Sequence, residues 1–169
     1  TVGIMLTHGS VIIELPTVDQ DILILILSVA GCLCVGMISG WTAPSMDLYP
    51  DLKNPPLSPP GILFPIVWTI LYILMGISLW MMYRKGHNIL FFILFALQLF
   101  LNFIWTPLYF AWGHMALALV DLVALWIVVF VMMGIAKMDD VKISAYLLIP
   151  YLLWLTFAAY LNIGTIILN

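Results

Sequence analysis

Residues 52–83 read LKNPPLSPPGILFPIVWTILYILMGISLWMMY, a proline-dense segment that passes directly into a long apolar run. An α-helix rises about 1.5 Å per residue, so roughly 20 helical residues cross the hydrocarbon of a bilayer. Proline fixes its own φ and restricts the residue before it, which predicts a stiff, partly extended loop ahead of the helix. Such a loop is suited to close the mouth of a cavity. A rigid connector with no ligand role is the alternative.

The composition defines the class of protein. Apolar residues make up 65% of the 169-residue chain, charged residues make up 8%, and the mean hydropathy is +1.20. A soluble domain carries about 25% charged residues, so this chain is predicted to be an integral membrane protein. The net charge of −3 and the lack of a basic patch argue against a nucleic-acid partner.

The apolar runs predict an all-α bundle of five transmembrane helices at 21–169, preceded by an extension at 1–20. The expected helices are 22–41, 61–83, 88–109, 113–136 and 143–168, with the proline-rich loop at 42–60. Pro150 lies inside the last of these helices and should kink it.

Basic residues are distributed unequally between the two sides of such a bundle. The loops after the second and fourth helices carry Arg84, Lys85, Lys137 and Lys142, whereas the opposite side has only Lys53. The positive-inside rule then places the N-terminus inside and the C-terminus outside, in a bacterial cell membrane.

Several polar side chains lie at membrane depth. Gln98 and Asn102 are four residues apart on one helix face, and Trp105 lies near that face. Asp121 and Asn162 belong to the last two helices. Such residues either bind a ligand or proton or join helices through hydrogen bonds. The joining role is favoured for Gln98, Asp121 and Asn162, while both roles stay open for Asn102.

The tryptophans allow similar alternatives. Trp41, Trp80 and Trp112 fall near helix ends, where aromatic belts occur. Trp68 and Trp154 lie deeper, either as packing residues or as flat walls for an aromatic ligand, and their residue type alone favours packing. The sequence contains no metal-ligand cluster, no cofactor motif and no catalytic Ser/His/Asp set, so neither a metal nor a cofactor is expected.

Five segments carry a resemblance to a known family. They are YPDL at 49–52 with the prolines after it, FPIVWTILY at 64–72, the run 98–110 that contains WTPLYF, the piece 116–122, and 150–162, which begins PYLLW. In order and spacing the chain resembles the translocator protein family, also called tryptophan-rich sensory proteins or peripheral benzodiazepine receptors. The resemblance covers roughly residues 28–168, and its sequence motifs are similar to those of bacterial members.

The resemblance implies a five-helix bundle, usually a homodimer, with a ligand pocket open toward the first loop. It implies a membrane receptor that binds porphyrins, haem-related tetrapyrroles, isoquinolines or benzodiazepines, with a role in sensing or transport. The alternatives are light-dependent porphyrin breakdown, which would use Trp68 and Trp154, and transport of a lipid or sterol. The ligand-binding residues implied by the family are Tyr49, Trp68, Asn102 and Trp154, with Ser39, Trp105, Ala158 and Leu161 beside them. For Trp68 and Trp154 the resemblance therefore favours a pocket over packing.

The chain also departs from the family pattern. Leu57 replaces the usual loop tryptophan, and Gly61 replaces a common arginine. Ile163 and Ile167 stand where the sterol motif has its tyrosine and its basic residue, which weakens the expectation of sterol binding.

Overall fold

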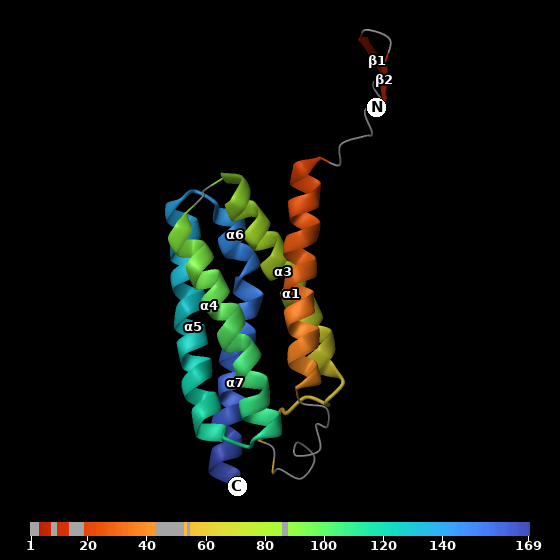
Figure 1. Ribbon diagram of the computed structural model, residues 1–169. Coiled ribbons are helices and arrows are strands. Elements are labelled where there is room, and N and C mark those ends of the chain that lie inside the picture. The colour runs from red at the N-terminus through yellow and green to blue at the C-terminus, as the bar shows by residue number, and fades with distance from the viewer. Residues whose placement is uncertain (1–3, 8–9, 14–18, 43–52, 54, 86–87) are drawn as a thin grey trace.

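The computed structural model of the chain describes residues 4–7, 10–13, 19–42, 53, 55–85 and 88–169. Within these residues, five helical spans are long and apolar enough to cross a membrane, which confirms the predicted all-α bundle (Figure 1). The extension additionally contains a short antiparallel hairpin of β1 (Ile4–Thr7) and β2 (Ser10–Ile13), in which Ile4 pairs with Ile13. The membrane domain itself is helical.

The first two spans are α1 (Gln20–Trp41) and α3 (Leu63–Lys85). Asp19 starts α1, because its side chain accepts a hydrogen bond from the Asp21 amide at 3.2 Å. Pro65 lies in the first turn of α3, where its missing N–H costs little.

Helix α3 continues two residues beyond its expected end at residue 83, and its last turn is held against the start of α1. The Arg84 side chain forms an ion pair with Asp21 at 3.1 Å and lies 5.0 Å from the ring centre of Trp80. The Trp80 indole N–H also donates to the Asp21 carbonyl at 3.0 Å. These contacts extend the helix into what the sequence suggested was a turn.

The third span changes its winding near its end. Helix α4 (Ile89–Thr106) is followed by the π-helix η1 (Pro107–Ala111), in which the Trp112 amide donates to the Pro107 carbonyl at 2.9 Å. The sequence predicted a uniform helix to residue 109. Pro107 has no N–H to continue the α-helical ladder, and the wider π turn accommodates it while the chain keeps its course.

The last two spans are α5 (Met115–Met138) and the pair formed by α6 (Lys142–Leu147) and α7 (Ile149–Leu168). Gly113, at a φ of +65°, makes the turn before α5. The fifth span is interrupted at Leu148, just before Pro150, as the proline predicted.

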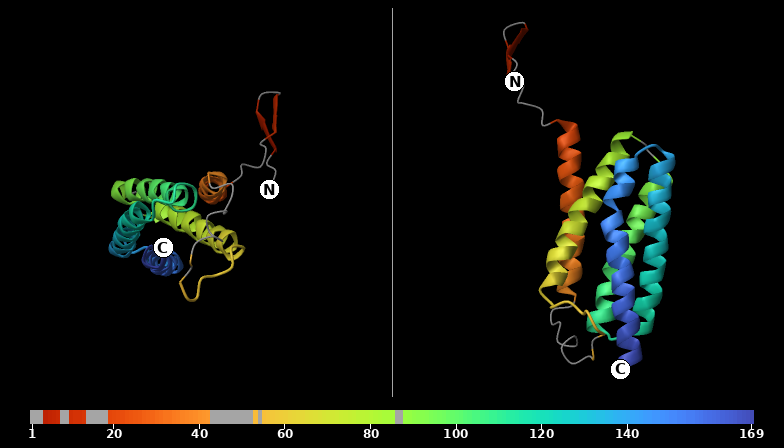
Figure 2. Two further views of the ribbon diagram at one scale, coloured as in Figure 1. Left: turned by 90° about the horizontal axis from the view of Figure 1, so that it is seen from below. Right: turned by 180° about the vertical axis from the view of Figure 1, so that it is seen from behind.

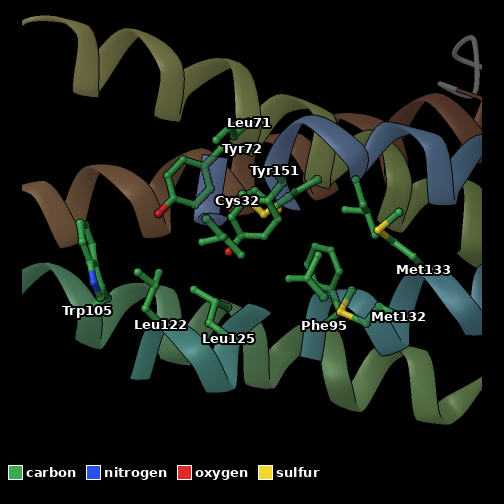
Figure 3. Packing of buried hydrophobic residues seen from close by; sticks show 14 of the residues in the cluster. Cys32, Leu71, Tyr72, Phe95, Trp105, Leu122, Leu125, Met132, Met133 and Tyr151 are labelled. Atoms are coloured by element: carbon green, nitrogen blue, oxygen red, sulfur yellow. The ribbon is translucent and has the colours of Figure 1, made fainter. Parts of the chain in front are cut away.

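The helices form two packed groups. Helix α1 packs along α3, α4 packs on α5, and α5 packs on α7, while α6 connects α3 to the second group (Figures 1 and 2). The α3–α6 contact is made by Ser78 and Ser144, whose hydroxyls lie 2.7 Å apart and reach each other's carbonyls at 3.1 Å. Figure 3 shows side chains from both groups meeting in the interior, among them Tyr72, Trp105, Leu122 and Tyr151.

Two glycines allow the close crossing of α1 and α3. A Cβ at Gly76 would lie 2.5 Å from the Val29 Cα, and one at Gly36 would run into the Tyr72 ring. Larger residues at either position would push the helices apart.

The described part of the proline-rich loop lies on α7. The Lys53 amide donates to the Asn169 side chain at 3.0 Å, and the Asn169 amide donates back to the Lys53 carbonyl at 3.1 Å. The Tyr160 hydroxyl donates to the Pro56 carbonyl at 2.7 Å. This part of the loop thus lies against α7 before the chain enters α3, at the end of the bundle that carries the C-terminus, called here the loop end (Figure 1).

Candidate functional site

A cavity of about 340 Å³ lies between α1, α3 and the end of α4, in the half of the bundle nearer the loop end. This volume is within the range of sites for drug-sized ligands, about 300–1,000 Å³. The described lining residues are Leu33, Gly36, Met37, Ser39 and Gly40 of α1, Phe64, Pro65, Trp68, Thr69 and Tyr72 of α3, and Trp105, Thr106 and Phe110.

Aromatic rings form most of the inner wall. The rings of Trp68 and Trp105 have their centres 6.4 Å apart, and Phe110 meets Trp105 edge to face at 5.7 Å. Tyr109 stacks on Trp105 at 5.2 Å and is held by a 3.0 Å hydrogen bond to Thr165 of α7. The π-helix therefore positions Tyr109 and Phe110 around Trp105, and this fixes the shape of the wall.

Most polar groups in the wall already have partners. The Ser39 hydroxyl donates to the Phe103 carbonyl at 3.3 Å, and the Thr69 hydroxyl donates to the Pro65 carbonyl at 2.7 Å. Among the described residues, the indole N–H of Trp105 is buried and has no partner. Since buried donors are nearly always bonded, this N–H is available to an acceptor inside the bundle.

Behind the cavity, a hydrogen-bonded network joins three helices. The Tyr72 hydroxyl donates to the Asn102 side-chain oxygen, and the Asn102 amide donates to the Tyr151 hydroxyl at 2.8 Å. Tyr151 in turn donates to the Gln98 oxygen at 3.0 Å, so α3, α4 and α7 are connected. The second amide group, Nε2 of Gln98, is buried without a partner among the described residues.

The other two polar residues at membrane depth differ from each other. Asn162 joins α7 to α5 when its side-chain amide is oriented with the nitrogen toward the Met115 carbonyl. In that orientation it donates to this carbonyl at 2.9 Å and accepts from the Leu119 amide at 3.2 Å. One carboxylate oxygen of Asp121, Oδ2, is buried and has no partner among the described residues.

The residues implied by the family fall into three groups in the structure. Ser39, Trp68 and Trp105 line the cavity together. Asn102 lies behind Tyr72, and Trp154 lies behind Phe64, with ring centres 5.9 Å apart. Ala158 and Leu161 are buried on α7 and are not part of the lining, while Tyr49 lies outside the described residues.

The structure adds residues that the sequence analysis did not name. Phe64 and Tyr72 lie one helical turn before and after Trp68, on the same face of α3, and both line the cavity. The spacing of four residues between these aromatics was a usable signal. Phe110 had no such signal, because its position depends on the π-helix.

The fold and the cavity define a multi-pass membrane protein with an aromatic chamber of ligand size between its first three spans. Residues 28–168 match the model of the TspO/MBR family, and the chain belongs to that family.

Three relatives illustrate the range of the family. "Tryptophan-rich protein TspO" of Chlorobaculum tepidum is 38% identical over 158 residues, which cover 89% of this chain and 99% of that protein. "Protein CrtK" of Rhodobacter capsulatus is 33% identical over 143 residues, covering 82% and 88%. "Translocator protein" of Sus scrofa is 36% identical over 119 residues, covering 68% and 70%. The similarity therefore spans bacterial and animal members of the family.

Proposed function

We propose that the protein is a membrane receptor for porphyrins and related flat, hydrophobic ligands, with a role in sensing or transport. The observation that carries this proposal is the cavity wall in which Trp68 and Trp105 face a common space with Phe64 and Phe110. A tetrapyrrole is wide, flat and largely apolar, and indole rings stack on such surfaces or flank their edges.

The size of the cavity bears on how such a ligand fits. At about 340 Å³ the cavity is at the small end of the range for drug-sized ligands. A tetrapyrrole therefore fits only if part of the cavity wall is displaced. Phe64 separates the cavity from Trp154. Displacement of the Phe64 ring would bring Trp154, and Ala158 one turn further along α7, toward the ligand. In this proposal Trp68 and Trp105 make the first wall and Trp154 the second, while Asn102 holds Tyr72 in place and offers a polar contact behind it.

The test is a titration of the purified protein with protoporphyrin IX in the dark, followed by quenching of tryptophan fluorescence. We expect saturable quenching, with affinity lowered in Trp68→Phe and to a smaller extent in Trp154→Phe. A buried hydrophobic wall residue contributes about 1–3 kcal/mol, of which Phe retains a part. Trp126→Phe is the matched control, because Trp126 faces the α5–α7 surface and bonds Thr156 at 3.0 Å. Absence of saturable quenching in the wild type would contradict the proposal.

Light-dependent breakdown of the bound porphyrin is a second proposal. It is favoured by the spacing of oxidisable rings, since the centre of Trp68 is 6.4 Å from that of Trp105 and 5.7 Å from that of Tyr72. Illumination of the same samples should yield a product with a new absorption spectrum, and Trp68→Phe and Trp154→Phe should lose it. Identical bleaching of free and bound porphyrin would rule this activity out.

The assembly follows the family pattern in our proposal, namely a homodimer in a bacterial cell membrane. The exposed apolar side chains on every span fit contact with lipid or with a second copy. Size-exclusion chromatography with light scattering in mild detergent would give the mass of the protein part, and a monomer at all concentrations would contradict the dimer.

A further inference from the structure

The cavity described above reaches the outer surface of the bundle. Four of its lining residues, Met37 and Gly40 of α1 and Pro65 and Thr69 of α3, are exposed, with Met37 exposed to 57%. The outer surface of a membrane span faces lipid, so these four residues frame a gap between the cavity and the bilayer. We call this gap the lateral opening.

The lateral opening lies at a defined depth. Helix α1 ends at Trp41, so Met37 and Gly40 belong to its last turns, within about 6 Å of its loop end along the axis. Trp41 itself is 77% exposed, as expected for an aromatic residue at the membrane interface. The opening therefore meets the outer part of the acyl chains in the leaflet on the loop side.

Helices α1 and α3 close the lateral opening at Gly36 and leave it open at Gly40. At Gly36 a Cβ would run into the Tyr72 ring, so α1 and α3 touch there. At Gly40, one turn nearer the loop, a Cβ would meet no atom of the described residues within 4 Å. The contact between the two helices at Gly36 is thus not repeated at Gly40, which lines the cavity and leaves space where any other residue would place a side chain.

The four residues that frame the lateral opening are chemically suited to the passage of an apolar ligand. Their one hydroxyl, on Thr69, is bonded to the Pro65 carbonyl at 2.7 Å and so presents no free donor to lipid. Met37 has a flexible, polarisable side chain that adapts to different shapes. Beyond the frame lie the rings of Trp68 and Trp105.

We propose that ligands enter the cavity sideways from the bilayer through the lateral opening, rather than from water. This inference rests on the proposed binding function and narrows its ligand class to membrane-dissolved lipophiles with a flat ring system and a polar edge, which concentrate at this depth. Gly40 keeps the entrance open because it has no side chain to fill it.

The first test measures binding rates in proteoliposomes after rapid mixing with protein-free vesicles loaded with protoporphyrin IX, with transfer between vesicles measured separately. Gly40→Leu puts a side chain into the opening. We expect it to slow association and dissociation together, each about tenfold. Gly31→Leu is the matched control, because a Cβ there also meets nothing within 4 Å and Gly31 does not line the cavity. Association that is unchanged in Gly40→Leu overturns the inference.

The second test uses no porphyrin and separates the entrance from the binding function. Lipids brominated near the headgroup end of the acyl chain quench tryptophan at short range, and the contribution of Trp68 is obtained by comparison with Trp68→Phe. An open entrance predicts that these lipids quench Trp68 in the wild type and in Gly31→Leu, but much less in Gly40→Leu. If the brominated lipids fail to quench Trp68 in the wild type and in both variants, the lateral opening is overturned. If Trp68 is quenched as expected while porphyrin fails to bind, the entrance stands and the proposed ligand is wrong.

Discussion

At the scale of single residues, the two amides of α4 have different roles although both are buried. Asn102 is bonded on both sides, to Tyr72 and Tyr151, whereas Gln98 accepts one bond and its Nε2 has no partner in the described part of the chain. Replacement of Asn102 by Leu removes two bonds and deprives the Tyr72 hydroxyl of its acceptor, while the Tyr151 hydroxyl keeps its bond to Gln98. Replacement of Gln98 by Leu removes one bond and one unsatisfied donor; Tyr151 loses the acceptor of its hydroxyl proton but still accepts from Asn102.

We therefore predict that Asn102→Leu destabilises the protein by about 1–2 kcal/mol, in keeping with hydrogen bonds in membrane bundles, and that Gln98→Leu costs clearly less. Reversible unfolding in mixed detergent micelles measures both free energies. The pair is well matched, since both residues are amides on one face of one helix and neither is more than 2% exposed. An equal or larger loss in Gln98→Leu would contradict this difference between the two amides.

The indole N–H of Trp105, which has no partner among the described residues, leads to a prediction about ligand chemistry. If a bound porphyrin accepts from it through a carboxylate, Trp105→Phe should weaken protoporphyrin IX by roughly 0.5–1.5 kcal/mol more than it weakens an alkyl porphyrin without carboxylates. Comparative fluorescence titrations of the two porphyrins would measure the difference. An equal loss for both would mean that Trp105 contributes only its ring surface.

At the scale of elements, the hydropathy and the prolines were enough to predict five helices, because membrane spans must be apolar and internally hydrogen-bonded. The π-helix at Pro107 could not be predicted, since a proline there is equally compatible with a simple helix end. The cavity could not be placed either, because it depends on where α1 and α3 cross, and that is set by contacts of Gly36 and Gly76 with the opposite helix. The resemblance pointed to Trp68, Trp105 and Trp154 together, and in the structure Trp68 and Trp105 line the cavity whereas Trp154 contacts Phe64 of its wall.

The contact between the proline-rich loop and α7 is also a property of elements. A Cβ at Gly164 would lie 2.5 Å from the Cβ of Pro55, a rigid ring that cannot move without its backbone. We predict that Gly164→Ala displaces the loop from α7 and weakens the bonds that Lys53 makes with Asn169. Trypsin should then cleave after Lys53 several times faster, since proteolysis follows local opening.

Gly134→Ala is the control for this experiment, because a Cβ at Gly134 in α5 meets nothing within 4 Å. Mass spectrometry of the fragments identifies the cut after Lys53. Equal cleavage rates in the wild type and both variants would mean that the described contacts do not hold the loop.

At the scale of the whole molecule, the bundle has one basic end. Arg84 and Lys85 end α3, and Lys137 and Lys142 flank the connection from α5 to α6. The two connections lie at the same end, where the Asn88 side chain donates to Asp139 at 2.8 Å (Figure 1). Lys53 is the only other Lys or Arg in the sequence and is bonded to the C-terminal residue at the opposite end.

This asymmetry predicts the orientation of the protein in a bacterial inner membrane. Basic residues in short loops stay on the cytoplasmic side, whereas the acidic residues near them contribute little. Alkaline phosphatase fused after Asn169 should therefore be active, and green fluorescent protein fused at the same point should be dark, because each folds on one side only. Changing all four basic residues at the basic end to Gln leaves Lys53 as the remaining Lys or Arg, so the same fusions should then report a mixed or inverted population. A fluorescent C-terminal fusion on the unaltered chain would reverse the assignment and place the loop, together with the leaflet that meets the lateral opening, on the cytoplasmic side.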